Sequence, residues 1–310
     1  MGTENFTSTI EFIMVGLTNN RKTQILLFFL ILFIYLFTLV ANLMIIILVR
    51  RNSHLHTPMY FFLTNLSGLE MCHVTTTMPQ MMTHLLTGNG SISFARCMAQ
   101  MAVVLSLGGT ECFLLGVMAY DRYLAICRPL VYAIAMGKWQ QLCLALASWL
   151  SAFFLALVTV LFLIRFPFCG SNYVNHFYCE IPVVMKLVCG DIRVTEAMLF
   201  FESAVGLVTP LIVILISYGL ILSTVIRMQS TSGRQKAFST CASHMVVVTI
   251  FYGTLLYMYL KPQAGTSPDR YKHTATIYAI VTPLLNPIIY TLRNKDIHKA
   301  VNKMLQRKGF

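Results

Sequence analysis

Long runs of apolar residues, each interrupted by a few polar positions, recur along the whole chain. Seven of these runs are long enough to cross the hydrocarbon core of a bilayer as helices. They cover residues 25–49, 59–86, 98–118, 142–164, 197–226, 237–260 and 274–292. The first, fourth and last runs contain no charged residue. The pattern predicts an all-α protein, a seven-transmembrane helix bundle with short connections.

The segments that flank the predicted bundle are polar. Residues 1–24 form the expected extracellular N-terminal segment, with Asn5 in an Asn-Phe-Thr glycosylation signal. This segment lacks the layout of a cleavable signal peptide, so the first span is expected to act as the targeting signal. Residues 25–292 form the transmembrane domain. Residues 293–310 are expected to be a cytoplasmic segment with a short amphipathic eighth helix on the acidic inner leaflet.

Composition and charge support a membrane protein and give its orientation. Hydrophobic residues make up 57% of the chain and charged residues only 11%, against about 25% charged in soluble domains. The net charge is +12, and one predicted side carries 14 of the 23 Lys and Arg with only two acids. The positive-inside rule makes that side cytoplasmic, which places the N-terminus outside. The basic excess therefore indicates topology rather than nucleic-acid binding.

Two acids, Glu70 and Glu111, lie at comparable depth in the middle of the second and third spans. Carboxylates in lipid must share protons, face water or hold a cation such as sodium. A carboxylate pair could also serve acid–base catalysis, but no nucleophile motif or metal-ligand spacing accompanies it. The chain is therefore not expected to be an enzyme or to carry another cofactor.

A third acid, Glu202, lies near the outer end of the fifth span. An acid inside a membrane span is a functional-site candidate by default. Glu202 could form a salt bridge with a basic ligand, accept a hydrogen bond from a ligand hydroxyl, or reach the outer water.

The ends of two spans carry prolines with local roles. Thr57 is expected to cap the second span and Pro58 to occupy its first turn. In the last span, Pro283 and Pro287 free backbone carbonyls, and the Asn286 side chain could bond within that gap. The last span is therefore expected to act as a hinge.

Four of the nine cysteines, Cys97, Cys169, Cys179 and Cys189, fall in the outer layer, where disulfides form. Their spacing permits three pairings and does not choose among them. His176 and Glu180 flank Cys179 in the long outer loop. That group could hold a metal, or the loop could be a disulfide-stapled lid with a surface histidine.

Several motifs together resemble those of rhodopsin-like G-protein-coupled receptors, and specifically of odorant (olfactory) receptors. They occur in order and cover nearly the whole chain. They are LHTPMY at 55–60, MAYDRYLAIC at 118–127, Ser217-Tyr218, KAFSTCASH at 236–244, FYGT at 251–254 and PLLNPIIY at 283–290.

The resemblance implies specific roles at matching positions. It pairs Cys97 with Cys179 and Cys169 with Cys189. It also implies that Arg122 is held at rest by its neighbouring acid and released to meet a stimulatory olfactory Gα, which raises cyclic AMP. The residues expected to serve coupling and activation are Asp121, Arg122, Tyr123, Tyr218, His244, Asn286, Pro287 and Tyr290. A sodium site would use Glu111 and Glu70, the latter standing where the family usually has Asp.

The same resemblance implies a plasma-membrane receptor of olfactory cilia whose ligand is a small volatile molecule. Glu202 stands where such receptors usually have neutral residues, which favours an amine or another hydrogen-bond donor. The residues expected to line the pocket are Val104, Leu105, Gly108, Gly109, Glu202, Gly206, Tyr252, Leu255, Leu256, Tyr259, Thr276 and Ala279. Gly108 and Gly109 either add room or allow close helix packing.

Two rival functions fit parts of the pattern. A receptor of this fold could respond to a metabolite other than an odorant. A transporter or channel would also carry polar residues at mid-membrane, but no internal duplication of the kind common in transporters is found.

Overall fold

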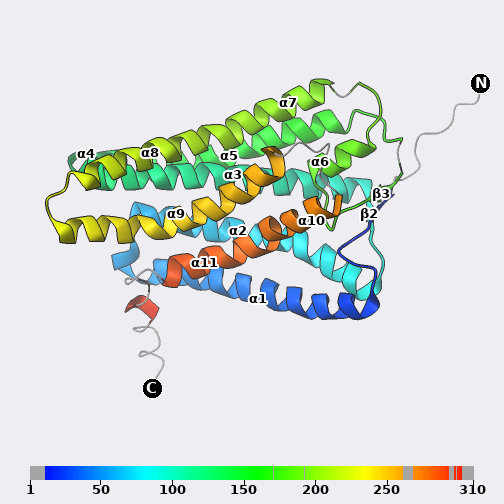
Figure 1. Cartoon of the computed structure of the whole chain (residues 1–310), viewed down its shortest axis with the longest axis horizontal. Helices are drawn as coiled ribbons and strands as arrows, with labels where there is room; N and C mark the ends of the chain where they lie inside the picture. The colour runs from blue at the N-terminus through cyan, green and yellow to red at the C-terminus, as the bar shows by residue number, and fades with distance from the viewer. Residues whose placement is uncertain are drawn as a thin grey trace, which may run out of the picture.

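The protein is a bundle of long helices, seen in a computed structural model that describes residues 11–169, 171–191, 193–260, 268–292, 297 and 299–301. Seven long helical segments, which we call rods, cross the bundle in this part of the chain. Each corresponds to one predicted span, which confirms the predicted fold (Figure 1). Four rods are the single helices α1 (Arg21–Arg51), α2 (Pro58–Thr87), α3 (Phe94–Cys127) and α5 (Lys138–Leu163). The fifth consists of α7 (Arg193–Ser203), η3 (Ala204–Val208) and α8 (Thr209–Ile226), and the sixth is α9 (Thr231–Leu260). The seventh consists of α10 (Pro268–Thr276), η5 (Ile277–Val281) and α11 (Thr282–Leu292).

Short elements fill the connections between these rods. They are η1 (Ser53–Leu55), α4 (Pro129–Ala135), α6 (Ile181–Val184) and η2 (Met185–Leu187). We call the end of the bundle that carries the disulfides the disulfide end, and the opposite end, near Asp121 and Arg122, the arginine end.

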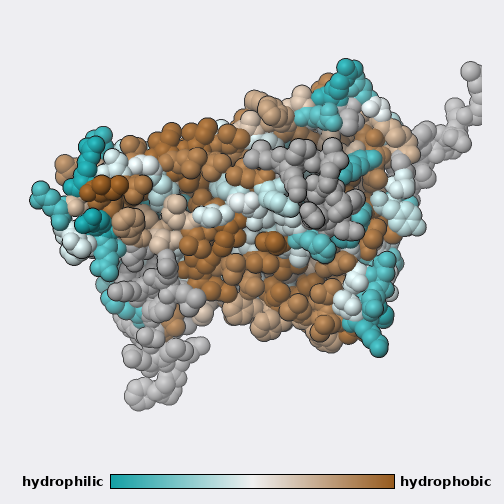
Figure 2. Space-filling model, viewed as in Figure 1, coloured by the Kyte–Doolittle hydropathy of each residue, from teal (hydrophilic) through white to brown (hydrophobic). Residues whose placement is uncertain are grey.

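The outer surface of the bundle suits a bilayer. Figure 2 shows hydrophobic residues across the middle of one face and hydrophilic residues at both ends. Among the described residues, four stretches are both long and apolar enough to span a membrane: Arg21–Arg51, Phe94–Cys127, Lys138–Leu163 and Arg193–Ile226. The apolar window of α3 is 61% buried and that of α1 only 22%. Thus α3 is the central helix and α1 lies at the edge, facing lipid.

Local sequence sets several helix ends. The Asn20 side chain accepts hydrogen bonds from two backbone N–H groups at the start of α1, and Ser93 does the same for Arg96 N–H at the start of α3. Pro58 begins α2 as predicted, but the Thr57 side chain makes no capping hydrogen bond, so that part of the prediction is wrong. Gly88 ends α2 with a positive φ of 74°, which glycine adopts easily.

A three-stranded sheet at the disulfide end was not predicted. Strand β1 (Glu11–Met14) pairs antiparallel with β2 (Ser91–Ser93) and parallel with β3 (Tyr173–Val174). It ties the N-terminal segment to two loops that are distant in sequence.

Both disulfides implied by the family resemblance are present. Cys97–Cys179 joins the start of α3 to the long loop, and Cys169–Cys189 closes that loop on itself. The three-stranded sheet, α6, η2 and the two disulfides cover this end of the bundle, and we call them together the lid.

The fifth and seventh rods each contain a π turn immediately before a Thr-Pro pair. In both, the sequence around the pair is Val-Thr-Pro-Leu. The backbone N–H of Thr209 donates to Ala204 O, and that of Thr282 donates to Ile277 O, each five residues back. Each threonine hydroxyl donates to the same carbonyl, at 3.2 Å and 3.4 Å. Proline has no N–H and crowds the preceding turn, which the wider π turn relieves.

The flanking segments are covered only in part. The glycosylation signal at Asn5 lies outside the described residues, as does most of the predicted eighth helix. Two described residues of that region, Ile297 and Ala300, are buried, at 1% and 7% exposed, and pack on the main core.

Candidate functional site

Three polar side chains from three rods meet in the middle of the bundle. Asn286 on α11 donates hydrogen bonds to one oxygen of Glu70 on α2 and to Oε1 of Glu111 on α3, the latter at 3.4 Å. The exposed fractions of Glu70, Glu111 and Asn286 are 0%, 1% and 3%. We call these three residues the carboxylate cluster. The structure confirms that the two acids lie together. The Asn286 side chain was expected to bond within its own helix, but it bonds across the bundle to both acids.

The carboxylate cluster leaves polar capacity unused. Glu70 Oε2 is buried and has no hydrogen-bond partner among the described residues. One turn away on α2, His73 is fully buried, and neither ring nitrogen has a partner there. Its ring meets the edge of Tyr278, with centroids 5.3 Å apart. No group of three or more metal-ligating side chains occurs within the described part of the chain.

Neighbouring glycines on α3 have different surroundings. A Cβ at Gly108 would lie 2.6 Å from the Tyr278 hydroxyl, so this glycine makes room for the tyrosine. A Cβ at Gly109 would lie 3.1 Å from Ala152 Cβ, so this glycine lets α3 and α5 pack closely. The sequence interpretation left room-making and packing open for both glycines and did not single out Tyr278.

The other residues expected to line the pocket occupy several environments. Val104, Tyr252, Leu255 and Ala279 are buried in the main core, in the same cluster as Tyr278. Leu105 packs with residues near the disulfide end, while Leu256 and Thr276 are partly buried. Gly206 lies in η3 with open space beside it, and the side chain of Tyr259 is outside the described residues. Their role in ligand binding stays a prediction.

Glu202 on α7 is directed toward α5. Its Oε2 accepts a hydrogen bond from the hydroxyl of Thr159, which is 3% exposed. Both residues line a groove of about 550 Å³ between α5 and α7. Sequence reasoning placed Glu202 on the central pocket and did not identify Thr159 as its partner.

At the arginine end, Asp121 is bound by a tyrosine from the following loop. The Tyr132 hydroxyl, on α4, donates to Asp121 Oδ1 at 2.9 Å. No ion pair joins Asp121 to Arg122 within the described residues, and Arg122 Nε is buried without a partner there. The direct ion pair expected between Asp121 and Arg122 is thus not formed within the described residues, and Asp121 is bound by Tyr132 instead. The role of this pair in activation stays a prediction.

The other residues expected to serve coupling lie around the same end. The Tyr218 hydroxyl on α8 and His244 Nδ1 on α9 are 2.6 Å apart, so two rods are joined there. Tyr290 is 4% exposed, and its hydroxyl has no partner among the described residues. Tyr123 is partly buried and stacks on Tyr120, and Pro287 lies inside α11.

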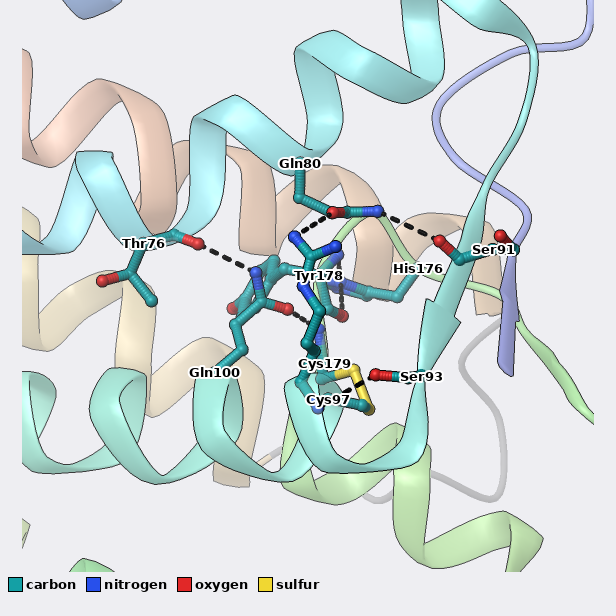
Figure 3. The surroundings of a disulfide bond; sticks show 10 residues. Thr76, Gln80, Ser91, Ser93, Cys97, Gln100, His176, Tyr178 and Cys179 are labelled. Carbon is teal, nitrogen blue, oxygen red and sulfur yellow. Dashed lines mark hydrogen bonds between the residues drawn. A yellow bond between two sulfur atoms is a disulfide. The ribbon is translucent and has the colours of Figure 1, made fainter. Parts of the chain in front are cut away.

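The lid is bonded to the bundle by a glutamine that sequence reasoning missed. Gln100 on α3 donates to Thr76 O at 2.9 Å and accepts from Cys179 N–H at 2.9 Å (Figure 3). It therefore links α2, α3 and the disulfide-bonded loop. The family resemblance gave the disulfide partner of Cys179 but not this hydrogen bond, since an amide on a buried helix face carries no pairing signal.

His176 is an internal part of the lid rather than a surface residue. It is fully buried, its ring stacks on Phe177, and its Nε2 lies 3.5 Å from Glu180. Burial, together with the nearby Lys272 ammonium, lowers the pKa of His176 to about 3. The imidazole is therefore neutral at physiological pH, and its approach to Glu180 is not an ion pair.

Comparisons with known proteins identify the family. The sequence model of a family described as "Olfactory receptor" matches residues 31–308. Human "Olfactory receptor 2G3" is 46% identical over 310 residues, covering 99% of this chain and 100% of that protein. Human "Olfactory receptor 10A3" is 44% identical over 308 residues, covering 99% and 98%. The chain therefore belongs to the olfactory receptor family, whose members are membrane receptors and not enzymes.

Proposed function

We propose that this receptor binds a small volatile ligand inside the disulfide end of the bundle. In response, it activates a stimulatory, olfactory-type G protein that raises cyclic AMP. The observation that carries the proposal is the carboxylate cluster, which joins three rods midway between the lid and Arg122. A ligand that shifts these rods changes polar contacts that are costly to leave unmade inside a membrane.

The arginine end supplies a surface suited to a G protein. Arg122 Nε is buried without a partner among the described residues, so the guanidinium has a donor that a change in the surrounding helices can bring to a partner. Beside it, α4 exposes apolar side chains, with Leu130 93% and Ile134 75% exposed. Exposed apolar residues on a short helix are typical of a docking element. The asymmetry of basic residues supports a cytoplasmic position for this end, with the N-terminus outside the plasma membrane. In olfactory neurons we expect the ciliary membrane.

The coupling proposal is tested by comparing two arginines of the same end. Arg122→Gln is expected to abolish ligand-evoked cyclic AMP, while Arg227→Gln, at an exposed position at the end of α8, serves as the matched charge control. Surface expression of both variants is measured by labelling an N-terminal tag on intact cells. Normal signalling by the Arg122 variant would refute the mechanism, and labelling only after permeabilisation would refute the orientation.

The ligand class is tested by screening. Cells expressing the receptor are exposed to matched amines, acids, alcohols and esters, and cyclic AMP is recorded. Ligand-evoked flux across vesicles without G protein would instead support a transporter or channel.

We also propose that a sodium ion can occupy the carboxylate cluster. The partnerless Glu70 Oε2 supports this, since a hard cation prefers carboxylate oxygens. The melting temperature of purified receptor is expected to be higher in sodium chloride than in choline chloride at equal ionic strength. Glu111→Gln should remove most of that difference, and equal melting of the wild-type protein in both salts would count against a bound ion.

A further inference from the structure

A groove on the outside of the bundle has the features of a second ligand site. It lies between α5 and α7, which pack side by side at one edge of the bundle (Figure 1). Its volume of about 550 Å³ falls within the usual range of small-molecule sites, about 300–1,000 Å³. Phe154 and Phe201 stand on its two helices, with the smaller Val158 and Ala197 also in its lining. We call this the α5–α7 groove.

The α5–α7 groove opens toward the hydrocarbon phase. Phe154 is 64% and Phe201 62% exposed, and both belong to stretches that are apolar enough to span a membrane. Nearly all of the groove lining is apolar. A ligand therefore reaches the groove by partitioning into the bilayer, without passing under the lid.

The polar feature of the groove is the hydrogen bond between Thr159 and Glu202. Thr159 occupies only Oε2 of the carboxylate, and Oε1 has no hydrogen bond to any described residue. No described cation forms an ion pair with Glu202. Arg193 also lines the groove, but it lies nine residues from Glu202, about 13 Å along the helix, and its guanidinium is bound to Asp191 at 2.6 Å. An acid in apolar surroundings without a cation beside it is costly, so the part of the groove around Glu202 is complementary to a positively charged group.

We propose that the α5–α7 groove binds an amphiphilic amine from the bilayer. Its ammonium group donates to Glu202 Oε1, and its apolar body lies between Phe154 and Phe201. An alcohol of the same chain length would make a weaker, uncharged hydrogen bond, and a fatty acid would bring a second carboxyl to Glu202. This site is separate from the interior of the bundle, so the inference does not depend on the function proposed above.

The test uses decylamine with a photoreactive diazirine in its tail and purified receptor in lipid nanodiscs. After illumination, labelled peptides are mapped by mass spectrometry. We expect labelling in residues 154–159 and 194–202, and we expect decylamine to compete better than decanol or decanoic acid. Glu202→Gln should lower the labelling about tenfold or more, because a charge-assisted hydrogen bond is lost.

Two further variants separate binding from folding. Glu196→Gln removes an acid from the exposed first turn of α7, outside the groove, and should leave labelling unchanged. Ala197→Leu fills the groove while keeping the acid and should lower labelling as Glu202→Gln does. Melting temperatures confirm that each variant is folded, and competition is repeated only with folded variants.

Three results would overturn the proposal. These are labelling that Glu202→Gln leaves intact, equal competition by decanol, and labels confined to peptides of the bundle interior. None of these measurements uses cyclic AMP, so a failure of this site and a failure of receptor signalling remain distinguishable.

Discussion

Replacing Gly90 by alanine tests how the N-terminal strand is held to the lid. A Cβ at Gly90 would lie 2.2 Å from the carbonyl oxygen of Met14 and 2.9 Å from the ring of His84. The first neighbour is backbone and can move only with β1 itself. Overpacking of this kind costs about 1–3 kcal/mol. Moving β1 also stretches the hydrogen bond from Met14 N–H to Gly90 O, now 2.9 Å long, which adds about 1 kcal/mol.

The assay for Gly90→Ala is hydrogen exchange of the β1 amides in purified receptor. If the free energy of local opening falls by about 2 kcal/mol, exchange becomes roughly 30-fold faster at Met14 and Val15. The N–H groups of these two residues bond to the carbonyl oxygens of Gly90 and Val174. Gly88→Ala is the control, because it strains its own turn at φ 74° but places no atom within 4 Å of a neighbour. Unchanged exchange at Met14 in the Gly90 variant, or an equal increase in the Gly88 variant, would refute the reasoning.

Three further outcomes are expected from melting curves of purified receptor. Gly109→Ala should lower the melting temperature by crowding Ala152, and adding Ala152→Gly should recover part of the loss; no recovery would exclude that contact as the cause. Tyr132→Phe should lower the free energy of unfolding by about 1–3 kcal/mol, because Asp121 Oδ2 already lacks a partner among the described residues and Oδ1 would lose its donor. Unchanged melting would argue against this bond. Acid should destabilise the lid, because the pKa of His176 is held near 3 in the folded protein, whereas in the unfolded chain the imidazole takes up a proton below about pH 6.5. Between these two pH values the free energy of unfolding falls by up to about 1.4 kcal/mol per pH unit. His176→Asn should flatten that dependence, and a decline equal to that of the wild type would assign it to other groups.

The course of the seven rods could be predicted because a bilayer imposes a minimum length of apolar sequence on each. The same reasoning brought Glu70 and Glu111 to a common depth. Their direct neighbour Asn286 lies 175 positions after Glu111, and nothing in local spacing indicates which way an amide on α11 points. The disulfide pairs also required the family resemblance, because spacing alone left three choices.

Contacts made by short, irregular segments escaped prediction for a different reason. Strand β1 has four residues, too few for an alternating pattern to stand out, and its partners come from distant loops. The bond from Tyr132 to Asp121 depends on how α4 folds back onto the end of α3. Such docking is decided by tertiary packing, which single-sequence patterns do not report.

The paired π turns change the angular register of two helices. Each turn accommodates one residue more than an ordinary α-helix, which rotates everything beyond it by about 100°. A helical wheel drawn straight from Tyr218 through η3 therefore assigns Glu202 to a neighbouring face. A one-residue deletion within η3 or η5 would turn the whole disulfide-end half of that rod and exchange the faces it shows to lipid and to the interior.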